Sequence, residues 1–170
     1  MCQEFLQKAW DAKHRKDYAE AEANYLACLK CDPENAEALR EQGLMYWGNF
    51  EKTVEAIALI EKSLALEDCA DGHFFLAMVN QECDPAMSAA EFRKAIEAYE
   101  LEGDATGLQG LAHCYYAELL AQEDKVIEAE EQFLQALRID PENETIQRNN
   151  ARFQKWLREN GKHPLASQDD

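Results

Sequence analysis

The chain has 170 residues, of which 34 are acidic and 17 are basic, so its formal net charge at pH 7 is −17. A surface this negative repels nucleic acids and anionic membranes, and no run of Lys and Arg offers contacts to phosphates. With 46% hydrophobic and 30% charged residues, the composition is typical of a folded protein with one domain or a short solenoid. Glu4 interrupts the N-terminal residues and no stretch of about 18 apolar residues occurs, so we expect neither a signal peptide nor a membrane span, and we predict a cytoplasmic location.

The six cysteines are predicted to be free thiols, because disulfide frameworks are typical of exported proteins and the N-terminal residues give no sign of export. Cys28 and Cys31 have the CxxC spacing of some metal and redox sites, but no second CxxC pair follows them. We therefore interpret Cys28 as a small, buried helix residue.

Helices are predicted along nearly the whole chain, since Ala, Glu and Leu dominate and only 7 Gly and 4 Pro occur. One pattern recurs within these helices. Residues 16–35 read KDYAEAEANYLACLKCDPEN, residues 124–143 read DKVIEAEEQFLQALRIDPEN, and residues 49–68 are a looser copy, NFEKTVEAIALIEKSLALED. In the two copies that contain DPEN, Pro cannot continue the preceding helix and Asn can cap the following one.

These segments resemble the second helix of the tetratricopeptide repeat, a helical hairpin of about 34 residues. Large residues of the first helix recur 34, 35 and 34 residues apart, and small residues lie where paired helices approach closely. The large anchors are Phe5, Leu39, Phe74 and Leu108, and the small residues are Ala9, Gly43, Ala112, Ala21, Ala56, Ala129 and Ala136. The fourth copy matches only with about five residues inserted near 121–126.

The resemblance implies an all-α fold, a right-handed superhelix of stacked antiparallel helix pairs with four repeats and a C-terminal capping helix. The expected boundaries are repeat 1 at 1–35, repeat 2 at 36–70, a degenerate repeat 3 at 71–103, repeat 4 with its inter-helix insertion at 104–143, a capping helix at 144–160 and a flexible tail at 161–170.

In this family, the first helices of successive repeats line a concave groove. Carrying the groove positions over residue by residue gives Leu6, Trp10, Lys13, Arg40, Leu44, Trp47, Phe75, Val79, Gln109, His113 and Tyr116. Aromatic anchors dominate binding energies at such surfaces, so the predicted ligand is a hydrophobic peptide or an amphipathic helix of another protein. The alternative is that a second subunit, or the chain's own ends, cover the same residues.

A basic cluster lies on the predicted capping helix and consists of Arg148, Arg152, Lys155 and Arg158. It is the largest positive group in an acidic chain and is therefore a candidate contact for an acidic segment of a partner. The alternative interpretation is a solvated helix face whose charges neighbouring acidic residues balance. A one-residue choice of register, which the sequence leaves open, decides where the cluster points.

The sequence contains no recognisable enzyme motif. The four histidines are scattered without HExxH spacing, and there is no GxSxG, Walker or GxGxxG motif. His113 and Cys114 are adjacent, but neighbouring residues on a helix point about 100° apart and cannot readily meet. We therefore predict no catalysis, no metal and no cofactor. The Lys, Asn and Arg clamp with which one branch of this family holds chaperone C-termini is also missing.

The predicted function is a non-catalytic protein–protein interaction module, that is, an adaptor, scaffold or chaperone-like cargo holder. The alternative is a structural subunit, in which the same surface forms a permanent homo- or hetero-oligomeric interface such as that of a homodimer.

Overall fold

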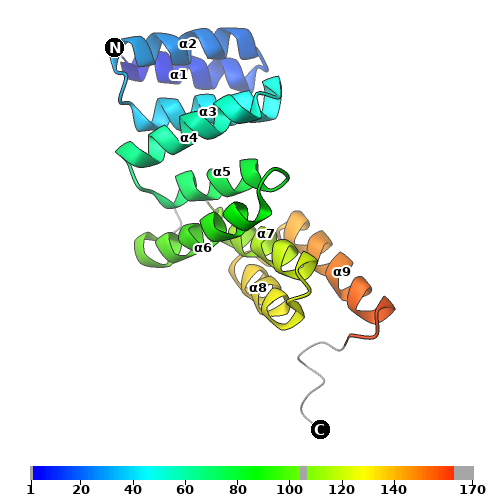
Figure 1. Cartoon of the computed structure of the whole chain (residues 1–170). Coiled ribbons are helices and arrows are strands. Elements are labelled where there is room, and N and C mark those ends of the chain that lie inside the picture. Colours follow the sequence, from blue (N-terminus) through cyan, green and yellow to red (C-terminus); the bar gives the residue numbers. More distant parts are fainter. Residues whose placement is uncertain (1, 104–106, 163–170) are drawn as a thin grey trace. The chain divides into compact units, whose positions relative to one another are not determined.

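The computed structural model describes residues 2–103 and 107–162, and within these ranges it contains helices and no strands (Figure 1). The predicted all-α fold is confirmed. No helix in the described ranges is both long enough and apolar enough to cross a membrane. Residues 163–170 of the predicted tail lie outside the described residues.

The chain divides into two compact units, and unit 1 comprises Met1–Asp84. Its helices are α1 (Cys2–His14), α2 (Tyr18–Cys31), α3 (Ala36–Phe50), α4 (Thr53–Leu66) and α5 (Ala70–Asn80). Helix α1 packs against α2 and α3 packs against α4, while α2 contacts α3 and α4 contacts α5. The core under α1 and α2 contains Leu6, Tyr25, Cys28 and Met45 together with closely packed alanines.

Unit 2 comprises Pro85–Asp170. Its helices are α6 (Pro85–Glu102), α7 (Gln109–Gln122), α8 (Val126–Ile139) and α9 (Glu144–Glu159). Helix α7 packs against α6, α8 and α9, and α8 also contacts α9. The division between the units falls inside the predicted third repeat, so the predicted repeat boundaries stay a prediction.

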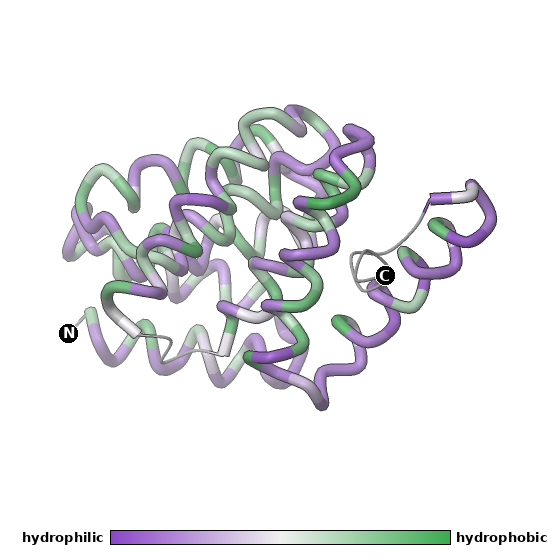
Figure 2. The backbone as a smooth tube through the Cα atoms, turned by 90° about the horizontal axis from the view of Figure 1, so that it is seen from below, coloured by the Kyte–Doolittle hydropathy of each residue, from purple (hydrophilic) through white to green (hydrophobic). Residues whose placement is uncertain are grey.

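Helix α9 is strongly amphipathic. Its buried residues Ile146, Asn149, Phe153 and Leu157 recur every three or four positions, which places them on one side of the helix. Figure 2 shows the resulting alternation of hydrophobic and hydrophilic residues along the helix that leads to the C-terminus. Because Ile146, Phe153 and Leu157 join the core of unit 2, α9 covers an apolar face that α7 and α8 would otherwise leave open.

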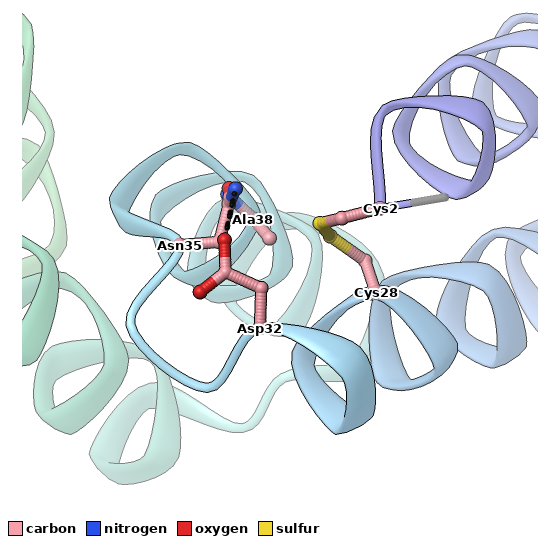
Figure 3. The surroundings of a disulfide bond; sticks show 5 residues. All are labelled: Cys2, Cys28, Asp32, Asn35 and Ala38. Atoms are coloured by element: carbon pink, nitrogen blue, oxygen red, sulfur yellow. Dashed lines mark hydrogen bonds between the residues drawn. A yellow bond between two sulfur atoms is a disulfide. The ribbon is translucent and has the colours of Figure 1, made fainter.

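The two DPEN sequences form the same hydrogen-bonded turn. The side-chain amide of Asn35 donates to Oδ2 of Asp32 (3.1 Å), and its Oδ1 accepts from the backbone N–H of Ala38 (3.0 Å; Figure 3). Asn143 donates to Oδ2 of Asp140 in the same way (2.9 Å) and caps α9. Each Asn therefore closes one turn and starts the next helix, as the sequence predicted.

The predicted insertion in the fourth copy is wrong. Helix α7 ends at Gln122 and α8 begins at Val126, so the connection is 123–125, as short as the connection 15–17 between α1 and α2. The extra residues instead precede α7, and the proposed anchor Leu108 is only the N-cap of that helix. The positions assigned to α7 therefore shift by five residues.

Cys2 and Cys28 form a disulfide, which corrects the prediction that all six cysteines are free (Figure 3). Because α1 and α2 are antiparallel, the first residue of α1 lies beside the last turn of α2, with the two Cα atoms 4.5 Å apart. Cys28 is nevertheless a small, fully buried helix residue, as predicted. Since cytosolic thiols are usually kept reduced, this disulfide does not support the cytoplasmic location, which stays a prediction.

Three of the small residues predicted at helix contacts, Gly43, Ala9 and Ala21, lie in close contacts, whereas the corrected register of α7 moves the position assigned to Ala112 to Ala117. Gly43 of α3 faces α4, where an added Cβ would lie 2.9 Å from Cγ1 of Ile60 and 3.1 Å from the carbonyl oxygen of Ala56. Ala9 and Ala21 are fully buried between α1 and α2. A larger side chain at any of these positions would force a helix pair apart.

Tyr25→Phe is expected to increase the free energy of unfolding by about 1 kcal/mol, because the Tyr25 hydroxyl is buried without a hydrogen-bond partner among the described residues. Burial, and then the charges of Glu41 and Glu37, raise the pKa of Tyr25 above its usual value. The unfolded chain ionises near pH 10 while the folded chain does not, so wild-type stability falls above that pH. Urea unfolding at neutral pH and above pH 10 should show that the free energy of unfolding of the variant exceeds that of the wild type by an amount that grows with pH. A less stable variant would contradict this account.

Candidate functional site

The groove positions predicted in unit 1 fall into two groups. Leu6 and Val79 are buried, at 3% and 2% exposure, so they pack between helices and we remove them from the candidate surface. The other six are partly or largely exposed. We call these the unit 1 inner face: Trp10 and Lys13 of α1, Arg40, Leu44 and Trp47 of α3, and Phe75 of α5.

An ion pair connects the first two helices of the unit 1 inner face. Nζ of Lys13 lies 2.7 Å from Oε2 of Glu41, whose side chain is only 15% exposed. Trp10 precedes Lys13 by one turn and is 43% exposed, and Leu44 follows Glu41 by one turn. The two apolar side chains therefore lie on the helix sides that this ion pair brings together.

A small cavity lies beside Trp47. It measures about 120 Å³ and is lined by Trp47, Thr53, Met78, Val79, Gln81, Glu82 and Cys83. Helix α3 contacts α5 here, so the indole of Trp47 stands next to the helix that carries Phe75. The unit 1 inner face is thus mainly apolar, with a cationic group from Arg40 and one from Lys13.

The positions predicted in unit 2 are affected by the wrong register. Gln109 and Tyr116 are partly exposed, but His113 is 5% exposed, and its Nδ1 lies 2.7 Å from Oε1 of Gln132 on α8. Burial lowers the pKa of His113, against an opposing effect of the hydrogen bond with Gln132. His113 is therefore a neutral packing residue between α7 and α8 and not a groove residue.

The two DPEN copies, whose residue numbers differ by 108, provide the correct register for unit 2. Glu118 and Ala121 of α7 then correspond to Trp10 and Lys13 of α1. Both line a cavity of about 410 Å³ beside α9, which we call the α7–α9 groove. Its lining consists of Glu118, Ala121, Gln122, Phe133, Asn149, Arg152, Phe153 and Trp156.

The basic cluster of α9 is exposed, and Arg152 of this cluster lines the α7–α9 groove. Nζ of Lys155 lies 3.7 Å from Oε1 of Glu159. The other three members, Arg148, Arg152 and Arg158, make no ion pair within the described part of the chain. On the question of register that the sequence left open, the structure places Arg152 of the cluster at the border of a cavity.

The carboxyl group of Glu118 stands in this groove near the cluster. Burial raises the pKa of Glu118, while the charges of Arg152 and Arg148 oppose that rise. Glu118 and Trp156 are absent from the predicted site residues. The 108-residue offset between the DPEN copies was the signal that would have identified Glu118, but nothing in the sequence singled out Trp156.

Cys114 is not suited to act as a nucleophile. It is buried, and burial raises the pKa of its thiol to about 12, so the thiolate is not populated near neutral pH. Nδ2 of Asn149 lies 3.7 Å from its Sγ, which places the thiol in the packing between α7 and α9. Within the described ranges, no group of three or more His, Cys, Asp or Glu residues is placed to hold a metal ion.

Comparison with known proteins finds likeness in structure. No family model and no curated protein matches the sequence. The chain is similar to the crystal structure of MamA, with 19% identity, a TM-score of 0.70, and coverage of 94% of this chain and 85% of MamA. It is similar to PilF of Pseudomonas aeruginosa, with 16% identity, a TM-score of 0.81, and coverage of 93% of this chain and 69% of PilF.

A third similar structure is that of YrrB, described as a TPR protein with an unusual peptide-binding site. It is 22% identical, with a TM-score of 0.69 and coverage of 91% of this chain and 76% of YrrB. These likenesses, together with the helix pairs and the DPEN turns, confirm the predicted resemblance at the level of fold. The chain has the tetratricopeptide-repeat fold.

Proposed function

We propose that the protein is a protein–protein interaction module, acting as an adaptor, scaffold or cargo holder, whose unit 1 inner face binds a hydrophobic segment of another protein. The observation that carries this proposal is the exposure of Trp10, at 43%, beside the partly exposed Leu44 and Trp47. Large aromatic side chains that remain accessible on a surface made by several helices are typical binding anchors.

The segment bound is an extended peptide or an amphipathic helix, with apolar side chains against the indoles and a carboxylate near Arg40. Trp10 and Trp47 expose large aromatic area and have few rotatable bonds, so ordering them on binding costs little entropy. Their burial by the ligand would supply most of the affinity. Gln109 and Tyr116 are left out of this proposal, because the corrected register of α7 moves the groove positions to Glu118 and Ala121.

Trp47→Glu is expected to weaken partner binding by about 2–4 kcal/mol, because it places a charge where the proposed ligand is apolar. The test is affinity capture from the native cell lysate, followed by titration of the captured partner against the purified variants. Val54→Glu introduces the same charge at a position on α4 that is 78% exposed and lies outside this face, so it is the matched control. Equal capture by both variants, with both folded, would refute the proposed face.

The same variants test the alternative of a permanent oligomeric interface. Sedimentation velocity of the wild type over a range of concentrations should show a monomer if the face is free for a partner. A dimer that persists on dilution and is lost in Trp47→Glu, but not in Val54→Glu, would favour the structural-subunit alternative.

A further inference from the structure

The α7–α9 groove lies where the register of the DPEN copies places the counterparts of an ion pair of unit 1. In unit 1 the ion pair between Lys13 and Glu41 spans from α1 to α3. The DPEN alignment places Ala121 at the position of Lys13 and Asn149 at the position of Glu41. Neither can bridge the two helices, and the structure has a cavity of about 410 Å³ lined by both residues.

The inner wall of this groove is aromatic. The ring centroids of Phe133 and Phe153 are 5.0 Å apart, and those of Phe153 and Trp156 are 6.1 Å apart with nearly parallel planes. Trp156 remains partly exposed, and Nζ of Lys162 lies 4.7 Å from its ring centroid. The volume falls within the range of about 300–1,000 Å³ that is usual for ligand pockets, and it is sufficient for one large apolar side chain.

The rim of the groove is cationic. Arg152 lines it, Arg148 lies one turn earlier on the same side of α9, and neither has an ion-pair partner among the described residues. Glu118 is the acidic residue of the lining, and the charges of Arg152 and Arg148 act against the rise of its pKa. In a chain with a net charge of −17, two arginines without ion-pair partners beside an aromatic cavity are a local reversal of the surface charge.

We propose that the α7–α9 groove binds an acidic segment of a partner protein, with one large apolar side chain inserted against Phe133, Phe153 and Trp156 and neighbouring carboxylates paired with Arg148 and Arg152. Charge complementarity selects this occupant, because planar guanidinium groups pair well with carboxylates. The site lies entirely within unit 2 and does not depend on the proposed role of the unit 1 inner face.

The probe for this site is a short fluorescein-labelled peptide that carries one Phe between Asp and Glu residues, measured by fluorescence anisotropy with the full chain. One control peptide has Ser in place of Phe, and a second has Lys in place of the acidic residues. We expect the first peptide to bind, with an affinity that falls as salt is added, and both controls to bind at least about tenfold more weakly.

Two protein variants locate the binding. The double variant Ala121→Lys, Asn149→Glu introduces into unit 2 the two residue types of the Lys13–Glu41 ion pair. It fills the groove and leaves the net charge unchanged, so it should abolish binding. Arg152→Gln should weaken binding about tenfold or more. Arg138→Gln removes an equal charge from an exposed position on α8 that is not part of the groove lining, and it should leave the affinity unchanged.

Failure of the peptide to bind, or equal binding by the wild type and the folded double variant, would overturn the proposal. A wild-type dimer that the double variant abolishes would overturn it in favour of a second copy of the chain as occupant. Peptide binding that appears only after removal of residues 163–170 would overturn it in favour of the chain's own C-terminal residues. Trp47→Glu, measured in parallel, should retain peptide binding, so failure of the unit 1 proposal and failure of this one are separable.

Discussion

Phe133→Ala is expected to lower the free energy of unfolding by about 3–5 kcal/mol, the largest effect of any single substitution considered for this chain. Phe133 is 1% exposed and lies in the core that α7, α8 and α9 share. Its ring centroid is 5.0 Å from that of Phe153, so the substitution removes an aromatic contact as well as buried apolar area. Urea unfolding followed by far-UV circular dichroism measures the change.

The matched control is Leu134→Ala at the next position of α8. Leu134 is 53% exposed, so its truncation should change the free energy of unfolding by no more than about 0.5 kcal/mol. Similar losses from both variants would mean that α8 does not present Phe133 to the core as the structure describes.

Ala129→Leu is expected to destabilise the chain by about 1–3 kcal/mol, because it overfills a close contact between helices. Ala129 is fully buried in the core of unit 2, where α8 packs against α7. A leucine there must move a helix or adopt a strained rotamer. The thermal midpoint and the urea midpoint should both fall.

Ala151→Leu makes the same chemical change on the exposed side of α9 and serves as the control. It should leave both midpoints nearly unchanged, since no neighbouring helix limits the space at an exposed position. If Ala129→Leu were as harmless as this control, the assignment of Ala129 to the helix contact would be wrong.

Local rules predicted those parts of the fold that depend on few residues. Pro and Asn in the DPEN turns end one helix and cap the next through hydrogen bonds made within four residues, so their outcome is independent of the rest of the chain. Small residues at Ala9, Gly43 and Ala129 likewise mark close helix contacts, because no large residue can be accommodated there.

The start of α7 was predicted wrongly from the anchor spacing, although the 108-residue offset between the DPEN copies carries the correct register. The spacing of 34 residues pointed to Leu108 as an anchor, but a leucine before a helix and a leucine in its first turn have the same local pattern. The structure begins α7 at Gln109 and buries His113, Ala117 and Leu120. Packing against α8 determines which side of α7 is buried, and the DPEN turn after α8 marks that side in the sequence better than the leucine before α7 does.

The Cys2–Cys28 disulfide is a second example of a feature that tertiary contact decides. The residues are 26 positions apart in sequence, and their pairing follows from the antiparallel packing of α1 on α2. The prediction of free thiols depended on the expected compartment, which says nothing about whether two particular side chains meet.

The sequence by itself therefore determined the all-α class, the helix pairs, their turns and the small residues between them, because each depends on local propensity or on a steric limit at one contact. Only the tertiary structure decided which side chains remain accessible. It placed Leu6, Val79 and His113 in the interior, left Trp10 exposed, and opened a cavity between Ala121 and Asn149. Accessibility depends on the side chains of neighbouring helices, which are distant in sequence and come together only when the units fold.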